Sequence, residues 1–442
     1  MSVMPTATLP RCNRCFTRRS SGRRYAPPKV LQNARPNAFA HERPEYAAGL
    51  RVALFSGNYN YTRDGANKAL NRLVGHLLDH GAAVRVYSPT GRRPAFEPVG
   101  DLVSVPSLAI PGRAEFRLAL GLPRKIAEDV RNFAPNVVHV SAPDWLGTGA
   151  QRLAREMGVP IVASMHTRFE TYLDFYGLRG LRRWAVRRQR DFYCASDRVL
   201  APNGASRKDL RAMGVPVKRI GIWSRGVEHE LFNPARRDLA WRQGLGYANE
   251  DVVLLFFGRI VREKGTACFV ETVRELRQRG LAVRPLIVGD GPARAEMEAQ
   301  VGEAMFLGHL DGADLGRAIA SADILLNPSL TEAFGNVNLE AMAAGVCVVS
   351  ANVGSASAII ADGKDGYLIE PDPTAFADAV HKLANDRVTR RRVGQNATAT
   401  AESYQWSDVL DNVVRTYRDL SARSRSGDSR MPPFTNANPR HG

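Results

Sequence analysis

The sequence predicts an α/β protein with two doubly wound, Rossmann-like domains of parallel strands and helices, and three observations support this. Short apolar runs alternate with longer amphipathic stretches from Arg51 onward, as in βαβ units. The rhythm restarts after residues 224–238, so two series of similar length follow one another. The chain has 442 residues and 44% hydrophobic content, which is enough to bury two cores of ordinary size.

Seven apolar segments in the first series predict buried strands, and helical patterns such as residues 67–80 separate many of them. The segments are RVALFS, AAVRVYS, DLVSVPS, NVVHVSA, PIVASMH, DRVLAPN and RIGIWS. We assign residues 49–224 to this first domain.

The second series, assigned to residues 225–405, contains six more predicted strands that end in Gly, Asn, Ser or Pro. They are VVLLFFG, VRPLIVG, EAMFLG, ADILLNPS, VCVVSAN and GYLIEP. Apolar residues at helical spacing then predict a C-terminal helix, residues 406–422, that packs back on the first domain. Ligands of open α/β sheets bind beyond the carboxyl ends of the strands, so we expect the site in a cleft between the two domains.

Both ends of the chain are basic and polar. Residues 1–41 contain eight Arg or Lys and no acid, and the net charge of +17 indicates an anionic partner. We expect 1–48 to be a disordered basic extension and 423–442 a disordered tail. An Arg-rich, acid-poor N-terminus also suits a targeting segment, but it lacks the apolar region of a secretory signal. No apolar run approaches the roughly 18 to 20 residues of a membrane-spanning helix.

Five cysteines in so long a chain do not form a disulfide framework, which favours a reducing compartment. Cys12 and Cys15 form a single CxxC pair. A zinc site needs four ligands and no second pair follows at finger spacing, so we expect no metal site.

The stretch SLTEAFGNVNLEAMAAG, residues 329–345, places Glu332 and Glu340 on either side of a Phe-Gly-Asn turn. Its apolar spacing predicts a helix that begins at or just after Gly335. The first amides, from Gly335 to Asn338, would lack intrahelical acceptors and offer a seat for phosphate. Acids at this place could instead cap the helix, although Glu340 lies inside it.

Further candidate residues follow other predicted strands. Arg259 and Lys264 in FFGRIVREKG could together neutralise a diphosphate, or could form an ordinary solvated loop. LIVGDGP is either a close backbone approach to a ligand or a plain strand-to-helix turn. In the first domain, the polar segment SGNYNYTRDGANKALNRL and the strand-end His166 border the same space, although such a histidine is often only a satisfied polar residue.

Together these segments resemble the retaining glycosyltransferases of family 4, which have the GT-B fold. The resemblance covers about Arg51 to Leu420, and its most specific element is E-x7-E, preceded in the family's order by GRIVREKG and VGDGP. HTRFETY, DRVLAPN, IWSRGVEHELFNP and FLGHLDGADL are similar to bacterial mannosyltransferases that use GDP-mannose and to sulfoquinovosyl diacylglycerol synthases.

The resemblance implies a site with two groups of residues. The catalytic group is His166, Glu332, Arg259 and Lys264. The donor-binding group is Gly57, Gly65, Gly289, Asp290, Gly291, His309, Leu310, Phe334, Gly335, Asn336 and Glu340. Within them, Arg259 and Lys264 would hold the diphosphate, Glu332 the donor sugar and Glu340 the ribose hydroxyls, while His166 would face the reacting sugar.

The resemblance also implies the reaction and its partners. We expect a nucleotide sugar as co-substrate, no other cofactor and no metal, since no Asp-x-Asp sequence is present. The expected donor is GDP-mannose, with a UDP-linked glucose or sulfoquinovose as the alternative, and the acceptor is a lipid or a glycan. The basic amphipathic segment 178–193 could contact anionic membrane, or could be an ordinary domain helix.

The expected location is the cytoplasm, with peripheral contact at the inner face of the membrane. A non-enzymatic binder of anionic surfaces or nucleic acid is the alternative of another class. No nucleic-acid-binding signature is present, so we expect no specific nucleic-acid partner.

Overall fold

The structure is a computed structural model that describes residues 46–61, 65–91, 94–110, 113–166 and 182–426, all within the compact unit Pro44–Gly442. The basic extension up to residue 45, with its Cys12 and Cys15, lies outside the described residues. So do the tail from residue 427 and the first part of the predicted amphipathic segment, residues 178–181.

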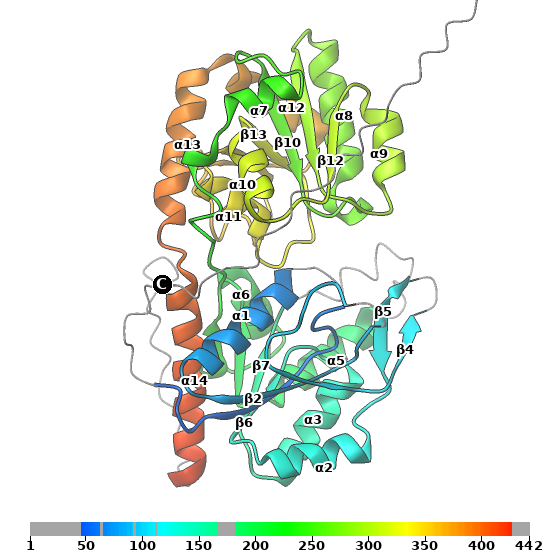
Figure 1. Cartoon of the computed structure of the whole chain (residues 1–442), viewed down its shortest axis with the longest axis vertical. Helices are drawn as coiled ribbons and strands as arrows, with labels where there is room; N and C mark the ends of the chain where they lie inside the picture. Colours follow the sequence, from blue (N-terminus) through cyan, green and yellow to red (C-terminus); the bar gives the residue numbers. More distant parts are fainter. Residues whose placement is uncertain (1–45, 62–64, 92–93, 111–112, 167–181, 427–442) are drawn as a thin grey trace, which may run out of the picture. The chain divides into compact units, whose positions relative to one another are not determined.

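The first half of the described chain forms a seven-stranded parallel sheet in the order β3-β2-β1-β6-β7-β8-β9. Figure 1 draws this half in blue to green. Its strands are β1 (Arg51–Phe55), β2 (Ala83–Ser88), β3 (Asp101–Ser104), β6 (Val137–Val140), β7 (Ile161–Ser164), β8 (Arg198–Ala201) and β9 (Ile220–Ile222). Its helices are α1 (Gly65–Asp79), α2 (Arg124–Phe133), α3 (Trp145–Glu156), α5 (Arg182–Cys194) and α6 (Gly204–Ala212). An antiparallel hairpin, β4 (Ser107–Ile110) and β5 (Arg113–Ala119), interrupts the connection from β3 to α2.

The second half forms a six-stranded parallel sheet in the order β12-β11-β10-β13-β14-β15. Its strands are β10 (Val252–Phe257), β11 (Val283–Val288), β12 (Met305–Gly308), β13 (Ile324–Asn327), β14 (Cys347–Ala351) and β15 (Tyr367–Ile369). Its helices are α7 (Leu239–Gly244), α8 (Thr266–Gln278), α9 (Arg294–Val301), α10 (Gly312–Ala320), α11 (Asn336–Ala343), α12 (Pro373–Asn385) and α13 (Arg387–Ala401). Within the described residues, short 3-10 turns are η2 (Val217–Arg219), just before β9 of the first half, and η3 (Pro234–Arg236) and η4 (Arg262–Lys264).

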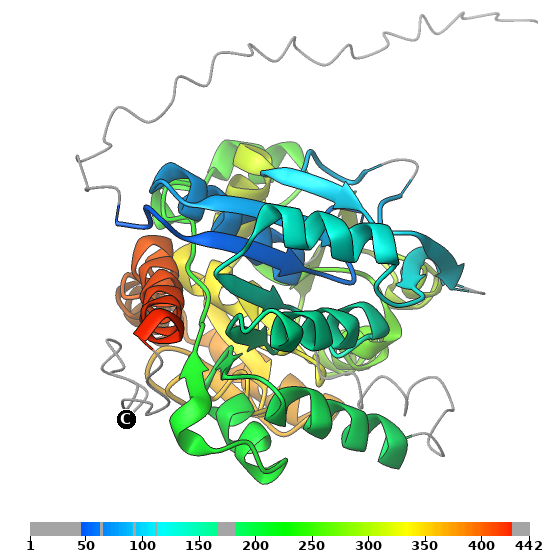
Figure 2. The same cartoon turned by 90° about the horizontal axis from the view of Figure 1, so that it is seen from below.

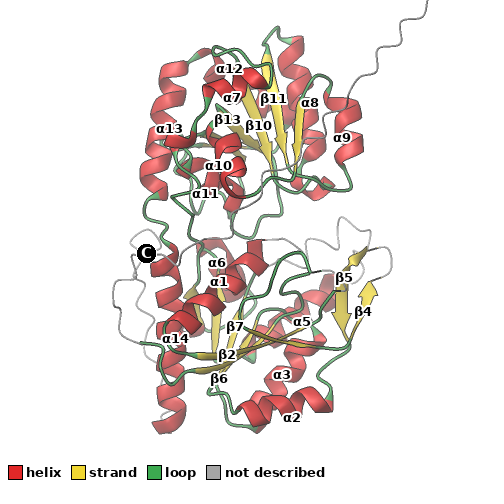
Figure 3. Ribbon diagram, viewed as in Figure 1, coloured by secondary structure: helices red, strands yellow, loops and turns green. Residues whose placement is uncertain are grey.

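Helices cover both faces of each sheet, as Figure 3 shows by colour. Alternate residues of β1 enter different hydrophobic clusters, with Ala53 and Phe55 in one and Val52 and Leu54 in the other. Strand β10 divides in the same way. Side chains alternate across a strand, so burial on both faces explains why these strands read as continuous apolar runs.

The last helix, α14 (Trp406–Ser426), packs on the first sheet although it follows the second in sequence (Figure 2). It contributes Leu410, Val413, Val414 and Tyr417 to the cluster around β1. The chain therefore passes twice between the halves, once after β9 and once between α13 and α14. The two crossings touch, because the Val227 amide donates to the Tyr404 carbonyl at 3.0 Å.

Each sheet has one point where the strand order reverses direction, between β1 and β6 and between β10 and β13. Ligands of such sheets bind at the carboxyl side of this switch point. The loops that follow these four strands therefore delimit the candidate site.

Candidate active site

The loop after β13 leads directly into α11, and the helix begins at Asn336 as the sequence predicted. Gly335 precedes it with φ +95°, a left-handed conformation that favours glycine. The amide of Asn338 donates to the carbonyl of Gly335 at 3.0 Å. The prediction that amides up to Asn338 lack an acceptor was therefore wrong at Asn338, and the seat at the helix terminus comprises the amides before it.

Lys264 and Glu332 form an ion pair at this helix terminus, with Nζ of the lysine 2.6 Å from Oε1 of the glutamate. Their side chains are only 23% and 17% exposed. Lys264 ends the turn η4, and Gly265 follows with φ +76°. A Cβ on Gly265 would lie 2.7 Å from the carbonyl oxygen of Pro328, so glycine allows the two loops to meet. The structure thus pairs two of the predicted catalytic residues.

Arg259 is exposed on the same loop and makes no ion pair among the residues that the structure describes. Its guanidinium is therefore available to an anion. Its assignment to a diphosphate stays a prediction.

Glu340 lies one turn inside α11 and is half-buried. Burial raises the pKa of its carboxyl from 4.5 to about 7, and the nearby charges of Glu228 and Glu332 add to the rise. Lys68 and Arg72, on helix α1 of the first half, oppose it. A carboxylate that lacks full solvation benefits strongly from hydroxyl donors, which is the chemistry that a ribose offers.

The loops after β10 and β11 lie against each other. A Cβ on Gly289 would be 1.8 Å from the carbonyl oxygen of Gly258, and one on Gly291 would be 2.3 Å from that of Ile260. These two glycines therefore permit a close approach between protein backbones. The exposed Asp290 accepts the amide of Gly291 at 2.7 Å.

The remaining donor-binding candidates divide between surface and core. His309 is exposed and Leu310 partly buried after β12. Phe334 is 5% exposed and its ring packs edge-on against Tyr404 inside the core. A nucleotide contact by Phe334 through its side chain would need that ring to leave the core.

In the first half, two predicted glycines lie in close contacts. A Cβ on Gly65 would be 2.2 Å from Nδ2 of Asn336, so the first residue of α1 touches the first residue of α11. A Cβ on Gly57 would be 2.6 Å from Oδ2 of Asp144, whose pKa burial raises to about 6. The structure thus brings together Gly65 and Asn336, two predicted donor-binding residues that are 271 positions apart in sequence.

His166 follows β7 and is almost fully buried. Its Nδ1 accepts from the guanidinium of Arg225 at 2.8 Å, and its Nε2 lies 2.8 Å from the hydroxyl of Ser164. Both ring nitrogens therefore have protein partners. Burial, and next the charge of Arg225, hold the pKa of His166 well below its usual value, so the ring is neutral at physiological pH.

Several polar residues that support the site were not singled out from the sequence. Asn203 donates to the carbonyl of Ala333 at 2.8 Å and so ties the first half to the loop before α11. Asn327 donates to Asn338, which donates to Ser350, beneath the start of α11. Asn203 and Asn327 are polar residues at strand ends, and that signal could have identified them.

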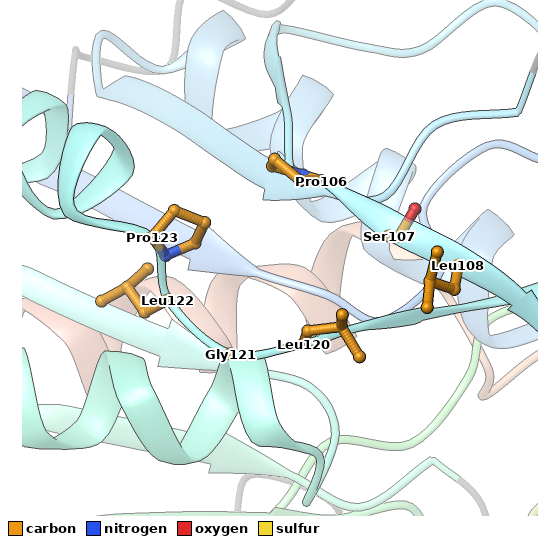
Figure 4. Close-up of a pocket in the computed structure, with 7 residues that line it drawn as sticks. All are labelled: Pro106, Ser107, Leu108, Leu120, Gly121, Leu122 and Pro123. Atoms are coloured by element: carbon orange, nitrogen blue, oxygen red, sulfur yellow. The ribbon is translucent and has the colours of Figure 1, made fainter.

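A pocket of about 300 Å³ lies in the first half, at the base of the β4–β5 hairpin (Figure 4). Its lining is mostly apolar: Pro106, Ser107, Leu108, Leu120, Gly121, Leu122 and Pro123. A Cβ on Gly149 of α3 would be 2.7 Å from Cβ of Leu122, so the pocket wall packs on α3.

Two families of known proteins match this chain, one in each of its two halves. Residues 63–231 match the family described as Glycosyltransferase Family 4, and residues 251–386 match Glycosyl transferases group 1. A GDP-mannose-dependent alpha-mannosyltransferase of Mycolicibacterium smegmatis is 32% identical over 381 residues, which cover 85% of this chain and 98% of the relative. The chain belongs to glycosyltransferase family 4. The predicted family and the prediction of an enzyme are thus confirmed, and a non-enzymatic binder is set aside.

One further relative and two solved structures also resemble this glycosyltransferase. The sulfoquinovosyl transferase of Arabidopsis thaliana is 31% identical, with 82% of this chain and 72% of the relative covered. Sucrose-phosphate synthase from Thermosynechococcus elongatus superposes with a TM-score of 0.70 at 20% identity, covering 84% of this chain and 99% of that one. HepE of Anabaena, solved with UDP and glucose, superposes with a TM-score of 0.66 at 18% identity, covering 84% of this chain and 100% of that one. The GT-B fold predicted from the sequence is confirmed.

None of the helices within the described ranges combines the length and apolarity that crossing a membrane requires.

Proposed function

We propose that this glycosyltransferase transfers mannose from GDP-mannose to a lipid or glycan acceptor, with retention of anomeric configuration. The observation that carries the proposal is the Lys264–Glu332 pair, 2.6 Å apart, at the N-terminus of α11. A cation, a carboxylate and helix amides at one strand end match the diphosphate and hydroxyl groups of a nucleotide sugar. The mycolicibacterial relative supports GDP-mannose as the donor.

Lys264 and Arg259 would bind the diphosphate together with the first amides of α11. As the bond from C1 of the sugar to the diphosphate oxygen breaks, negative charge grows on that oxygen, and these groups stabilise it more than they stabilise the ground state. The bond from C1 to the acceptor oxygen forms on the same face, and the acceptor hydroxyl proton passes to the departing diphosphate. Glu332, beside the donor sugar, would orient its hydroxyls.

No metal ion takes part in this scheme, because the cations and helix amides supply the charge that a metal would provide. Glu332 as a covalent nucleophile is a variant of the same scheme.

The Arabidopsis relative supports a second candidate, a UDP-linked donor such as glucose or sulfoquinovose. The two candidates share the diphosphate contacts and differ at the base and the sugar. The region of Gly289 to Gly291, His309 and Leu310 is where we expect the base, so it would carry the distinction.

An apolar acceptor suits the surface of the first half. Leu108 and Leu120, which line the pocket, are 61% and 64% exposed, and Trp145 and Trp184 are also exposed. Trp145 begins α3 directly after β6, and the hairpin follows β3, so these residues belong to the carboxyl edge of the parallel sheet. Arg183 beside Trp184 adds an exposed cation.

This combination supports a lipid acceptor presented by an anionic membrane, with the enzyme bound peripherally at its cytoplasmic face.

Thermal unfolding with added nucleotides tests the donor. We expect GDP-mannose and GDP to stabilise the protein, by about 2.7 kcal/mol at 100 times their dissociation constant. UDP-glucose and UDP-sulfoquinovose should have smaller effects. Stabilisation by the UDP sugars alone would establish the second candidate. Transfer of labelled sugar to lipid extracts, with and without EDTA, then tests acceptor class and metal independence, and loss of transfer in EDTA would contradict the metal-free scheme.

A further inference from the structure

A buried chain of hydrogen bonds connects the first crossing between the halves to helix α14. Nη2 of Arg225 lies 2.8 Å from Nδ1 of His166, and Nε2 of His166 lies 2.8 Å from Oγ of Ser164. The same Oγ lies 2.7 Å from Nε2 of His139. Nδ1 of His139 is hydrogen-bonded to the hydroxyl of Tyr417. We call these five side chains the histidine chain, and none of them is more than 9% exposed.

Arginine determines the protonation of the first histidine. A guanidinium has donors and no acceptor, so Nδ1 of His166 must accept and cannot carry a proton. A neutral imidazole then carries its proton on Nε2. His166 therefore donates to the hydroxyl oxygen of Ser164, and the contact with Arg225 determines its tautomer.

The protons of Ser164, His139 and Tyr417 can be arranged in two orders. The Ser164 hydroxyl is fully buried, and its partners in the described part of the chain are the two histidines. Since Nε2 of His166 already carries a proton, the hydroxyl can donate only to Nε2 of His139. In that order His139 is protonated on Nδ1 and donates to the oxygen of Tyr417, and the Tyr417 proton has no acceptor among the described residues. In the opposite order Tyr417 donates to Nδ1 of His139 and His139 donates to Ser164, and the Ser164 proton has no acceptor among them. One buried hydroxyl proton is unpaired in either order, so Arg225 determines the tautomer of His166 and burial does not determine that of His139.

We infer that His139 and Tyr417 are positioning residues that act through Ser164 to hold the His166 ring in one orientation, and that Arg225 sets the tautomer of His166. This inference rests on the proposed sugar transfer, with His166 facing the transferring sugar as the resemblance implies. Hydrogen bonds in a connected buried network polarise one another, so each member strengthens the next.

The packing around the histidine chain supports this positioning role. The ring of Trp223 meets both histidines edge-on, with centroids 4.9 Å from His166 and 5.7 Å from His139. Burial also lowers the pKa of His139 to about 3, so it remains neutral and one of its ring nitrogens can accept a hydrogen bond.

The histidine chain also connects His166 to the two segments by which the polypeptide passes between the halves. Arg225 belongs to the first crossing and Tyr417 to the helix that follows the second. A Cβ on Gly226 would lie 2.5 Å from the Trp406 amide nitrogen, so the crossings are in contact beside the chain. The orientation of His166 thus depends on both segments by which the polypeptide passes between the halves.

Nuclear magnetic resonance of protein labelled with ¹⁵N-histidine tests the proton order without donor or acceptor. Long-range correlation spectra distinguish protonated from unprotonated ring nitrogens, and the variants H166Q and H139Q assign the two signals. We expect His166 to be protonated on Nε2 only, and His139 to be neutral and protonated on one ring nitrogen. A proton on Nδ1 of His166, or a charged ring of either histidine at pH 7, would overturn the inference.

Steady-state kinetics test the positioning role, with whichever nucleotide sugar the wild-type enzyme uses. We expect Tyr417→Phe and His139→Leu to lower kcat about tenfold or more and to leave the donor KM within about twofold. His139→Gln should retain more activity than His139→Leu, because an amide oxygen can accept from Ser164. Tyr46→Phe is the matched control, since its hydroxyl also contacts α14, at Asp411, and lies outside the histidine chain.

Wild-type kcat in Tyr417→Phe, or equal losses in Tyr417→Phe and Tyr46→Phe, would refute positioning by the histidine chain. Transfer from a different donor would refute the proposed donor and leave both tests of the chain in force.

Discussion

The substitution Glu340→Gln should stabilise the protein at alkaline pH while impairing donor binding. The carboxyl of Glu340 is half-buried within α11, and burial raises its pKa from 4.5 to about 7. Between these pH values the folded protein holds a proton that the unfolded chain has lost. Stability therefore falls as the pH rises through this window, and the whole penalty is present above pH 7. A neutral amide of the same shape does not carry that penalty.

The magnitude follows from the pKa. A rise from 4.5 to about 7 costs about 3 kcal/mol once the carboxyl is ionised, at ~1.36 kcal/mol for each pH unit. Solvent reaches part of this side chain and screens the charge, so the expected gain for Glu340→Gln at pH 8.5 is about 1–3 kcal/mol. In a domain of this size that corresponds to a rise in Tm of about 2–4 °C per kcal/mol. At pH 4.5 the two proteins should be equally stable.

Thermal unfolding of both proteins at pH 4.5, 5.5, 7 and 8.5 measures this difference. Glu303→Gln serves as the control, because that carboxylate is 85% exposed and its neutralisation should leave Tm nearly unchanged at every pH. A Tm difference between wild type and Glu340→Gln that is the same at all four pH values would refute the reasoning, since it would show that the buried charge is not its source.

Donor binding by the wild-type protein should strengthen as the pH rises, whereas its stability should fall. In the proposed function, ribose hydroxyls would donate to the ionised carboxylate and bound donor would favour loss of the proton, so donor affinity should increase from pH 5.5 to 8.5. Glu340→Gln should bind donor more weakly and without this increase, since an amide does not ionise. Equal pH dependence in wild type and Glu340→Gln would exclude Glu340 as the responsible group. The expected gain in stability and loss of binding together are typical of a residue retained for function.

Four other substitutions, two of them at the same contact, test the remaining geometry. Lys264→Ala should reduce kcat by about 100-fold or more with little change in Tm, because it removes a cation from the departing diphosphate; near-normal turnover would contradict that role. Gly65→Ala should raise the donor KM, because its Cβ would lie 2.2 Å from Nδ2 of Asn336, and adding Asn336→Ala should restore part of the Tm that Gly65→Ala loses. Gly289→Ala should destabilise the fold by about 2 kcal/mol or more, because its φ is +137° and its Cβ would meet the Gly258 carbonyl; an unchanged Tm would refute this strain.

The fold could be predicted because its signals are local. Strands buried on both faces read as apolar runs, and the start of α11 at Asn336 follows from a glycine before apolar residues at helical spacing. Lys264 and Glu332 could also be selected, since each follows a strand of the same sheet. Their 2.6 Å ion pair could not be predicted, because it depends on how closely the two loops pack at Gly265 and Pro328.

The contacts of His166 could not be predicted, because they join residues from distant parts of the sequence. A strand-end histidine was expected to face the reacting sugar, yet its nitrogens bond to Ser164, two residues away, and to Arg225, 59 residues away. His139 and Tyr417 are 278 residues apart and meet only because α14 returns to the first sheet. Each of these residues also fits an ordinary strand or helix pattern, so nothing local distinguishes it.

The spacing of Glu332 and Glu340 has a physical explanation in the ion pair. The charge of Glu332 contributes to the raised pKa of Glu340, and Lys264 at 2.6 Å compensates that charge. In the proposed function, an arriving diphosphate would compete for Lys264 and leave Glu332 less compensated. Both carboxylates would then need new donors, and sugar hydroxyls on one side and ribose hydroxyls on the other would provide them. Two acids around one helix terminus would thus make binding of the diphosphate depend on the sugars attached to it, since an anion that lacks them would meet two unsatisfied carboxylates.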